Sequence, residues 1–454
     1  MKSTTTTPIL FITLSAALGG LLFGYDTAVI SGAIGDLTRY FNLTPMETGW
    51  AISSALLGCL LGALISDFCS STWGRKKTML LAALLFIINS IGTAIPDTFT
   101  VFVFYRIVGG VGVGLASMVV PMYIAEIAPA QRRGALVGNY QLAIVIGIVL
   151  VYFVNYGIAL QGDTHWNLTQ GWRWMFGSEL IPSVLFFIFI FFIPESPRWL
   201  FIQGKTEKAM TVLQAINGGH DIQKEREDIE QSLQSERPKA WKGLRKPEYK
   251  KALGVGIGLS LLQQLTGINA ILYYAPEIFK SLGSATDASL LETSTLGVVN
   301  LIFTLLAIRW VDRKGRKPLL YLGSIGMTLA LLSVGLFIYF EWEKTFVLPF
   351  LLLFMASFSI SWGPIVWVLL AEIFPNSIRS LALAISVFIQ WIANFLVTQF
   401  FPLMVENEWI ASYFKGAFPF YFFALLCLLS FFFVWKKVPE TKHLTLEEMN
   451  ALWK

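Results

Sequence analysis

Three ionisable residues interrupt the long apolar stretches of this chain, and they are the first candidates for chemistry. Asp26, Arg106 and Glu179 are the only charged residues inside twelve apolar windows. A charged side chain in the middle of a membrane span costs about 2.5–3.5 kcal/mol on insertion scales, so it marks a functional site by default. An acid beside an arginine in such a place can act as a proton switch, because protonation of the acid releases the arginine. A fixed structural ion pair is the alternative.

The depth of these residues follows from the helical rise of about 1.5 Å per residue. Asp26 and Arg106 lie roughly 12 Å, and Glu179 roughly 8 Å, from the same membrane face if each window is a helix. We therefore predict that Asp26, Arg106 and Glu179 meet at one level and take part in proton coupling, with Glu179 tuning the pair.

The composition requires a membrane protein. Of 454 residues, 55% are hydrophobic and 14% are charged, whereas soluble domains carry about 25% charged residues. The apolar windows cover residues 9–34, 50–66, 78–95, 98–122, 134–160, 174–193, 252–275, 293–308, 318–340, 345–371, 380–404 and 416–435. Because a helix needs about 20 residues to cross a bilayer, we predict an all-α integral membrane protein with twelve transmembrane helices in two six-helix halves.

Charge sets the predicted orientation and domains. Twenty-eight Lys and Arg residues fall in segments on one side of the predicted membrane and five on the other, which places both termini in the cytosol. The net charge of +5 therefore calls for no nucleic-acid partner. The predicted segments are an N-terminal half (1–193), a cytosolic helical linker (194–251), a C-terminal half (252–436) and a cytosolic tail (437–454). The predicted location is the plasma (inner) membrane, with multiple spans.

Cysteine and histidine give no sign of a disulfide framework or a metal site. The three cysteines and three histidines are scattered along the chain. The sequence shows no nucleophile–base or metal constellation, so we expect that the protein is not an enzyme and needs no cofactor. We also expect no obligatory protein partner; its surroundings are the lipid bilayer.

The chain contains an internal duplication. Three motifs recur after 241–246 residues: Gly74-Arg75-Lys76-Lys77 as Gly315-Arg316-Lys317-Pro318, Ala125-Glu126-Ile127 with Arg133-Gly134 as Ala371-Glu372-Ile373 with Arg379-Ser380, and Pro194-Glu195-Ser196 as Pro439-Glu440-Thr441. Such repeats are typical of secondary transporters, which hold the substrate between the repeats near the middle of the membrane.

The repeated charges predict a cytosolic gate. Its members are Glu126, Arg133, Glu372, Arg379, Arg75 and Arg316. Opposite charges at matching places in two halves can pair across their interface when the inner side is closed. Local pairing within each half is the alternative.

Amide and aromatic residues inside the spans predict a sugar site. Gln141, Gln263, Gln264, Gln390 and Trp391 lie well inside their windows. Amides both donate and accept hydrogen bonds, as sugar hydroxyls require. The spans show no cluster of positive charge, which argues against phosphate or carboxylate substrates. Hydrogen bonding between helices is the alternative explanation for any single glutamine.

The motifs together resemble those of sugar porters of the major facilitator superfamily over essentially the whole chain. They are Arg106-x-x-x-Gly110-x-Gly112-x-Gly114, Pro121-x-Tyr123-x-x-Glu126, Pro194-Glu195-Ser196-Pro197-Arg198-Trp199-Leu200, Gln263-Gln264-x-x-Gly267-x-Asn269, Asp312-Arg313-x-Gly315-Arg316-Lys317 and Pro439-Glu440-Thr441-Lys442. One position departs from the family pattern: Ser71 stands where the first-half loop usually has an acid.

The resemblance implies a proton-coupled monosaccharide symporter that works by alternating access. It implies that Asp26 couples transport to protons, because facilitators of the family typically lack this acid. It also implies that the sugar contacts Gln141, Gln263, Gln264, Asn269, Asn300, Trp367, Gln390 and Trp391, with Phe23, Tyr274 and Gly363 lining the pocket.

Two other functions are weighed against symport. A facilitator of the same fold would ignore protons, and Asp26 disfavours it. A non-transporting sugar sensor is expected to carry a long signalling tail, which the short segment after Lys436 disfavours. The choice between xylose and glucose stays open, because the two sugars differ by one hydroxymethyl group.

Two sequence patterns predict local structure inside the spans. The glycine run from Gly109 to Gly114 lies in an apolar span, so close helix packing explains it better than a nucleotide loop. Trp362-Gly363-Pro364 predicts a break in the tenth span.

Overall fold

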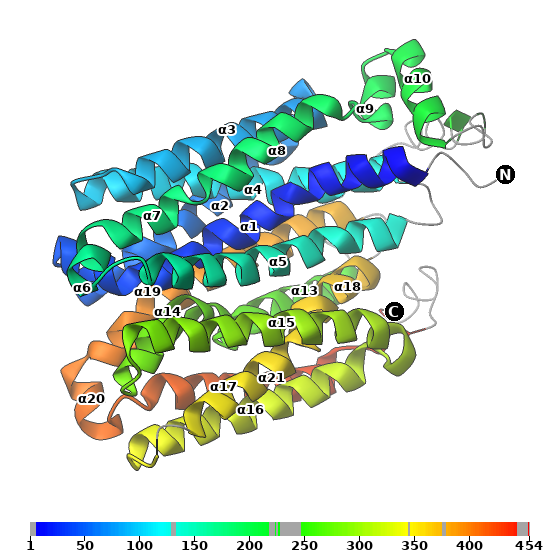
Figure 1. The fold of residues 1–454 in the computed structure, drawn as a ribbon. Coiled ribbons are helices and arrows are strands. Elements are labelled where there is room, and N and C mark those ends of the chain that lie inside the picture. The colour runs from blue at the N-terminus through cyan, green and yellow to red at the C-terminus, as the bar shows by residue number, and fades with distance from the viewer. Residues whose placement is uncertain are drawn as a thin grey trace. The chain divides into compact units, whose positions relative to one another are not determined.

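The protein is described by a computed structural model that covers residues 6–128, 133–217, 223, 226–227, 247–343, 346–374, 378–442 and 453. These residues form helices and no strand (Figure 1). Twelve helical segments among them are long and apolar enough to cross a membrane. The predicted fold class is therefore confirmed.

The helices before the linker are α1 (Thr6–Phe41), α2 (Pro45–Trp73), α3 (Arg75–Ala94), α4 (Phe99–Ile127), α5 (Arg133–Ala159), α6 (Thr164–Trp166), the π-helical turn η1 (Asn167–Gly171), α7 (Trp172–Gly177) and α8 (Leu180–Phe192). Two short helices follow, α9 (Pro197–Ile202) and α10 (Thr206–Asn217). In the predicted linker, residues 218–222, 224–225 and 228–246 lie outside the described residues.

The later helices are α13 (Pro247–Leu265), α14 (Ile268–Ser281), α15 (Thr286–Lys314), α16 (Arg316–Tyr339), α17 (Val347–Ser359), α18 (Trp362–Ile373), α19 (Arg379–Glu406), α20 (Glu408–Phe414) and α21 (Phe418–Lys437). In the predicted tail, residues 443–452 and 454 lie outside the described residues.

Three membrane spans are broken rather than continuous. The break between α17 and α18 falls at Ile360 and Ser361, and it matches the break predicted at Trp362-Gly363-Pro364. Pro364 lies in the first turn of α18, where its missing N–H is tolerated, and its ring excludes a continuous helix through the carbonyl of residue 360. Pro182 acts in the same way on the break between α7 and α8 at Ser178 and Glu179.

The break between α13 and α14 was not foreseen in the sequence. Gly267 between these helices has φ +84°, a left-handed conformation that glycine adopts at little cost. A Cβ at this position would also press on the ring of Phe423. The seventh span therefore turns at Gly267, between the glutamine pair and Asn269.

Glycines on α2 and α4 allow the backbones of these two helices to come into close contact. A Cβ at Gly58 or Gly62 of α2 would overlap backbone atoms of α4, and a Cβ at Gly110 or Gly114 of α4 would overlap backbone atoms of α2. Close packing of small residues is the usual way in which membrane helices associate. The glycine run in α4 is thus explained by packing.

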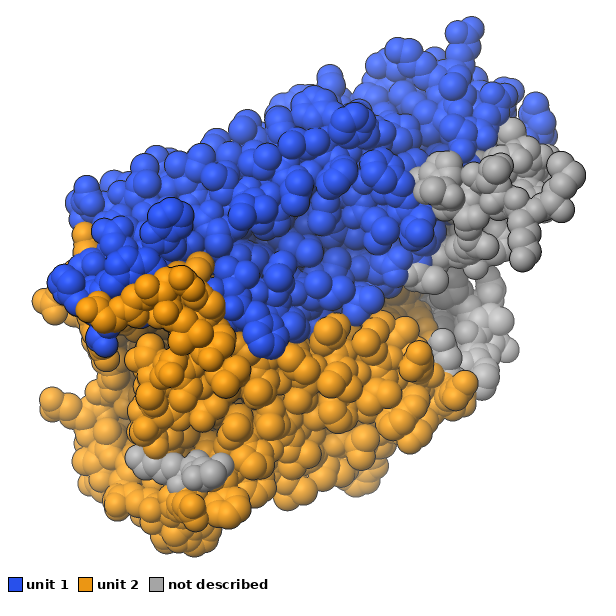
Figure 2. Space-filling view, in the orientation of Figure 1, with its two compact units in different colours: residues 1–30, 54–154, 164–236 blue, residues 31–53, 155–163, 237–454 orange. Residues whose placement is uncertain are grey.

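Contacts divide the chain into two compact units, which Figure 2 colours separately. Unit 1 comprises residues 1–30, 54–154 and 164–236, and unit 2 comprises residues 31–53, 155–163 and 237–454. The C-terminal end of α1, the N-terminal end of α2 and the C-terminal end of α5 group with unit 2. The predicted domain boundaries at 193 and 252 stay a prediction.

Gly110→Ala is expected to destabilise the protein, because the new methyl group meets the backbone carbonyl of Ala55 on α2. Overpacking of this kind costs about 1–3 kcal/mol. Thermal unfolding in detergent, followed by tryptophan fluorescence, measures the change. Gly254→Ala is the matched control, since a Cβ at Gly254 meets no atom within 4 Å apart from its chain neighbours and the backbone of its own helix. Equal unfolding temperatures for the two variants would contradict the packing assignment.

Candidate functional site

The structure brings Asp26 and Arg106 together in the interior of unit 1. Nη1 of Arg106 lies 3.0 Å from Oδ1 of Asp26. Asp26 on α1 has 0% of its surface exposed, and Arg106 on α4 has 1%. The guanidinium also lies 5.6 Å from the centre of the Phe176 ring on α7. The pair is therefore fully enclosed by protein.

Glu179 joins this pair through a residue that the sequence analysis missed. Nδ2 of Asn89 on α3 donates to Oδ1 of Asp26 at 2.7 Å and to Oε2 of Glu179 at 3.0 Å. Asn89 and Glu179 are both fully buried. The signal for Asn89 was a single asparagine in the uncharged third window. It lies six residues before residue 95, or roughly 9 Å from the same membrane face, so the same depth arithmetic could have found it.

The break between α7 and α8 gives Glu179 its position. Its backbone N–H donates to the carbonyl of Phe176, and its carbonyl accepts from Ser183. The adjacent Ser178 is hydrogen-bonded to the hydroxyl of Tyr25 on α1 at 2.7 Å. The break is thereby tied to the helix that carries Asp26.

The charges of this cluster do not balance when both acids are ionised. One guanidinium then faces two carboxylates, and an unpaired buried charge is strongly unfavourable. One bound proton on the two acids restores neutrality. The cluster can therefore hold or release one proton as its surroundings change.

A second polar cluster lies in unit 2, on either side of the break at Gly267. Gln263 and Gln264 end α13, and Asn269 begins α14. Nδ2 of Asn269 donates to Oε1 of Gln264 at 2.6 Å, and Nε2 of Gln264 donates to Oε1 of Gln263 at 3.4 Å. Gln263 and Gln264 are 3% and 6% exposed. The three amides form one chain of donors and acceptors, in which the two glutamines are buried and Asn269 is half-buried.

This amide chain is attached to the break in the tenth span. Nε2 of Gln263 donates to the carbonyls of Trp362 at 2.8 Å and Gly363 at 3.2 Å. Oδ1 of Asn300 on α15 accepts from Ser359 at 2.8 Å. The broken ends of two spans and three of the predicted sugar contacts thus share one hydrogen-bonded region.

The other predicted sugar residues fall in different surroundings. The Tyr274 hydroxyl donates to the carbonyl of Thr398 at 3.3 Å, and its ring stacks on Phe401. Trp367 is 41% exposed, while Gln390 and Trp391 are half-buried on α19. Phe23 and Gln141 are half-buried in unit 1, so the common cavity that the sequence predicted stays a prediction.

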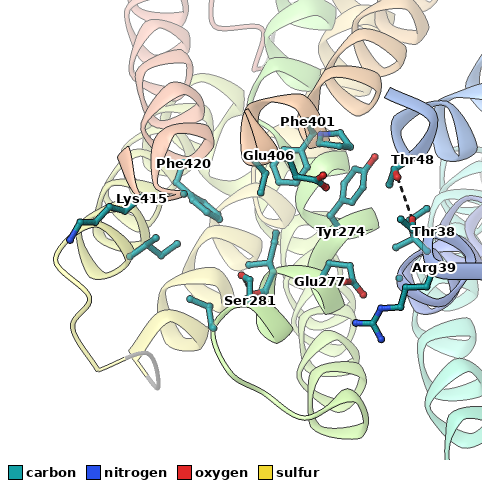
Figure 3. A pocket seen from close by; sticks show the side chains of 18 of the residues that line it. Thr38, Arg39, Thr48, Tyr274, Glu277, Ser281, Phe401, Glu406, Lys415 and Phe420 are labelled. Atoms are coloured by element: carbon teal, nitrogen blue, oxygen red, sulfur yellow. Dashed lines mark hydrogen bonds between the residues drawn. The ribbon is translucent and has the colours of Figure 1, made fainter. Parts of the chain in front are cut away.

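A cavity of about 500 Å³ lies in unit 2, at the end of α16 opposite Arg316 (Figure 3). Tyr274 is the only predicted sugar residue among those that line it. The remaining lining includes Arg39, Glu277, Glu406 and Lys415. The cavity therefore lies beside the predicted sugar cluster and does not contain it.

The first repeat of the motif charges forms a network inside unit 1. Arg75 makes two hydrogen bonds to the carboxylate of Glu126, at 2.8 and 2.9 Å, and Ser196 donates to the same carboxylate. Oε1 of Glu195 accepts from the backbone N–H groups of Arg75 and Lys76 at the start of α3. A carboxylate is favoured there by the helix dipole.

The second repeat forms the same network inside unit 2. Nη2 of Arg316 lies 2.8 Å from Oε1 of Glu372. Thr441 donates to that carboxylate in the place of Ser196. Glu440 accepts from the backbone N–H groups of Arg316 and Lys317 at the start of α16. The duplication found in the sequence is therefore also a duplication of contacts.

Glu126 and Glu372 thus have partners within their own half, as the local alternative describes. Arg379 donates to the carbonyl of Phe374. The side chain of Arg133 lies outside the described residues, and pairing across the halves stays a prediction. Sequence analysis named Arg75, Glu126, Arg316 and Glu372 as gate members without pairing them in this way. It also missed the supporting roles of Glu195, Ser196, Glu440 and Thr441. Their duplicated Pro-Glu-Ser/Thr motif was the available signal.

The two capping glutamates differ in their electrostatics. Burial raises the pKa of Glu195 above its ordinary value, although the N–H groups of Ser196, Lys76 and Arg75 oppose this. Burial also acts to raise the pKa of Glu440, but four backbone N–H donors outweigh it and the pKa lies below its ordinary value. Folding therefore favours the ionised form of Glu440 and disfavours that of Glu195.

No group of three or more His, Cys, Asp or Glu residues in the part of the chain that the structure describes is placed to hold a metal ion. The two polar centres in this part of the chain are instead a buried acid–arginine cluster that can carry a proton and an amide cluster that can bind hydroxyl groups.

Twelve spans, two matching charge networks and discontinuous helices define a secondary transporter with an internal repeat. Residues 12–453 match the family model described as "Sugar (and other) transporter". The chain belongs to this family of the major facilitator superfamily, and its relatives are transporters rather than enzymes.

Two curated relatives span nearly the full chain. The D-xylose-proton symporter of Escherichia coli K12 is 46% identical over 471 residues, which cover 98% of this chain and 96% of the relative. The arabinose-proton symporter of Bacillus subtilis is 42% identical over 446 residues, which cover 98% and 95%. Among solved structures, the inward open conformation of the xylose transporter XylE from E. coli matches with a TM-score of 0.88 and 43% identity, covering 98% of this chain and 100% of that chain.

Glu440→Gln is expected to lower the unfolding temperature at pH 7 more than Glu195→Gln does. The ionised Glu440 accepts four backbone N–H bonds, and their loss at a partly exposed site costs about 1 kcal/mol. Because the pKa of Glu440 is lowered by folding, this stabilisation is present above the ordinary carboxyl pKa and is lost as the pH falls. Thermal unfolding in detergent at pH 7 and at pH 4 measures both effects. A Glu195→Gln variant that is the less stable of the two would contradict the assignment.

Proposed function

We propose that this protein carries a monosaccharide across the inner membrane together with a proton, by alternating access. The observation that carries this proposal is the buried cluster of Asp26, Arg106 and Glu179, in which one guanidinium faces two acids with at most 1% exposure. A transporter that ignored protons would gain nothing from two costly acids in that place. The symporters of xylose and arabinose among the relatives support the same function.

The coupling follows from the charge balance of the cluster. With a proton on one acid, the remaining carboxylate and Arg106 are neutral as a pair, and the cluster can stay buried. When the proton leaves, a second negative charge competes for the same guanidinium. α1 then moves against α4 and admits water, which lowers the free energy of the unpaired buried carboxylate. Proton binding and the change of conformation are linked in this way.

The substrate is proposed to be a neutral sugar of the aldopentose class, such as xylose or arabinose. Gln263, Gln264 and Asn269 present amides that can exchange their mutual hydrogen bonds for bonds to sugar hydroxyls. Gln141, Asn300, Gln390, Trp391 and Trp367, with Phe23, Tyr274 and Gly363, complete the proposed pocket. The discontinuous spans at Gly267 and Ser361 support this location, since broken helices mark substrate sites in transporters.

The repeated charge networks are proposed to form the cytosolic gate. Arg75 with Glu126 and Arg316 with Glu372 hold the ends of their helices within each half. Arg133 and Arg379 are proposed to pair with the acids of the opposite half when that side closes. Both termini are proposed to lie in the cytosol, on the side with most of the Lys and Arg residues.

Asp26→Asn is expected to abolish accumulation of D-xylose driven by an imposed pH difference, while counterflow exchange of the sugar persists. The amide keeps the size of the side chain but cannot take up and release the proton. Uptake by proteoliposomes, with and without a pH gradient, separates the two activities. Asp97→Asn is the matched control, because this acid also pairs with an arginine but has 89% of its side chain exposed. Accumulation by the Asp26 variant at the wild-type level would refute proton coupling at this residue.

Gln264→Ala is expected to weaken sugar binding by about 5- to 150-fold, since the loss of one partner of a buried hydrogen bond costs roughly 1–3 kcal/mol. Isothermal titration with D-xylose, D-glucose and L-arabinose measures the affinity and orders the sugars. Gln161→Ala serves as a control, because this glutamine bonds only the carbonyl of Gly157 on an exposed loop. An unchanged affinity for all three sugars would remove Gln264 from the site.

A further inference from the structure

We infer that Asn89 is a positioning residue for proton coupling: its amide joins the two buried acids so that they hold one proton as a single unit. This inference rests on the proposed function, which assigns the proton to the Asp26–Arg106–Glu179 cluster. It adds an uncharged residue, on α3, to a cluster whose charged members come from α1, α4 and the α7–α8 break.

The hydrogen bonds of Asn89 are divided between the two acids. Its Nδ2 lies 2.7 Å from Oδ1 of Asp26 and 3.0 Å from Oε2 of Glu179. An amide nitrogen carries two hydrogens, so each acid receives one. Oδ1 of Asp26 also accepts from Arg106 at 3.0 Å. The amide and the guanidinium thus share an oxygen of Asp26, and the amide also donates to Glu179.

Packing fixes the side chain in this place. The backbone carbonyl of Asn89 accepts from the hydroxyl of Thr93 at 2.6 Å. Across the interface, a Cβ at Gly109 of α4 would overlap the Asn89 side chain. The absence of a side chain at Gly109 therefore creates the room that Asn89 occupies. Asn89 itself has 0% of its surface exposed.

An amide suits this task better than a charged or a hydroxyl side chain. A lysine would neutralise the second acid permanently and remove the need for a proton. A serine has one donor and could not serve both acids at once. An amide donates to an ionised carboxylate and can accept from a protonated one, so it can serve either state. Acids joined in this way titrate as a pair rather than separately.

The titratable groups around Asn89 come from every helix that packs there. Tyr25 and Asp26 belong to α1, Cys59 to α2, Arg106 to α4, and Glu179 to the break between α7 and α8. The Tyr25 hydroxyl is bonded to Ser178. Arg106 is the one permanent cation among these groups, and α3 supplies no ionisable side chain at this level. The amide therefore links two acids whose carboxyl groups also interact directly with each other and with Arg106.

The test measures the pH dependence of D-xylose uptake driven by an imposed proton gradient. We compare the wild type with Asn89→Ala and with Asn89→Leu, which keeps most of the volume. Without the amide, the ionised acids lose a hydrogen-bond donor and retain their proton to higher pH. The pH at which driven uptake falls to half is expected to rise by about one to two units, or ten- to a hundredfold in proton concentration. Counterflow exchange is expected to persist.

Ser90→Ala is the matched control. Ser90 is equally buried on the same helix, but its hydroxyl bonds only carbonyls of its own helix. This variant is expected to keep the wild-type midpoint. A midpoint unchanged in both Asn89 variants would overturn the inference and leave Asn89 a packing residue.

Failure of the inference is distinct from failure of the proposed function. If Asp26→Asn loses accumulation while the Asn89 variants keep the wild-type midpoint, coupling stands and the role of Asn89 falls. If Asp26→Asn accumulates sugar normally, the proposed function falls instead. Infrared titration of the wild-type protein with ¹⁵N-asparagine needs no variant: an asparagine amide band is expected to shift together with the carboxylic-acid band. A carboxylic-acid band that titrates without any asparagine shift would also overturn the inference.

Discussion

The enclosure of two acids with one arginine is the constraint around which unit 1 is arranged. Asp26, Glu179 and Arg106 have 0%, 0% and 1% of their surface exposed, so water cannot screen their charges. In that setting a carboxylate without a partner is far more costly than at a surface. The interruption at Glu179, the glycine that admits Asn89 and the bond from Tyr25 to Ser178 all bring polar groups to these acids.

Lipid imposes a second constraint, which explains where the amides lie in unit 2. Irregular backbone at membrane depth is tolerated only where protein encloses it, because hydrocarbon offers no hydrogen-bond partner. Gln263 supplies donors to Trp362 and Gly363 beside the break in the tenth span. Asn269 begins the helix that follows the break at Gly267 and bonds back to Gln264. The groups that stabilise the breaks are therefore the same groups that can bind hydroxyls.

The duplicated motifs form the same arrangement of contacts in both halves, but the individual contacts differ between the two copies. Arg75 engages Glu126 through two nitrogens, whereas Arg316 engages Glu372 through Nη2. The capping glutamates differ too, since burial dominates at Glu195 and backbone donors dominate at Glu440. The two networks are therefore expected to respond differently to pH and to substitution.

The sequence by itself determined the spans, the duplication and the depth of the buried charges. Apolar length fixes the number of helices, and a constant helical rise places Asp26 level with Arg106, so these conclusions need no knowledge of packing. Pro364 likewise indicated the break in the tenth span, because proline acts on its own helix. The break at Gly267 escaped notice because glycine permits a left-handed turn without requiring it.

Only the tertiary structure decided which side chains meet. Depth could have placed Asn89 at the level of the acids but could not give it partners, since its role arises from α1, α4 and the α7–α8 break converging on one point of α3. The partner of Glu126 was equally undetermined, because Arg75 is near it only once α3 lies against α4. Hydrogen bonds and ion pairs act over a few ångströms. Residues far apart in the chain acquire such neighbours through helix packing, which periodicity and composition do not encode.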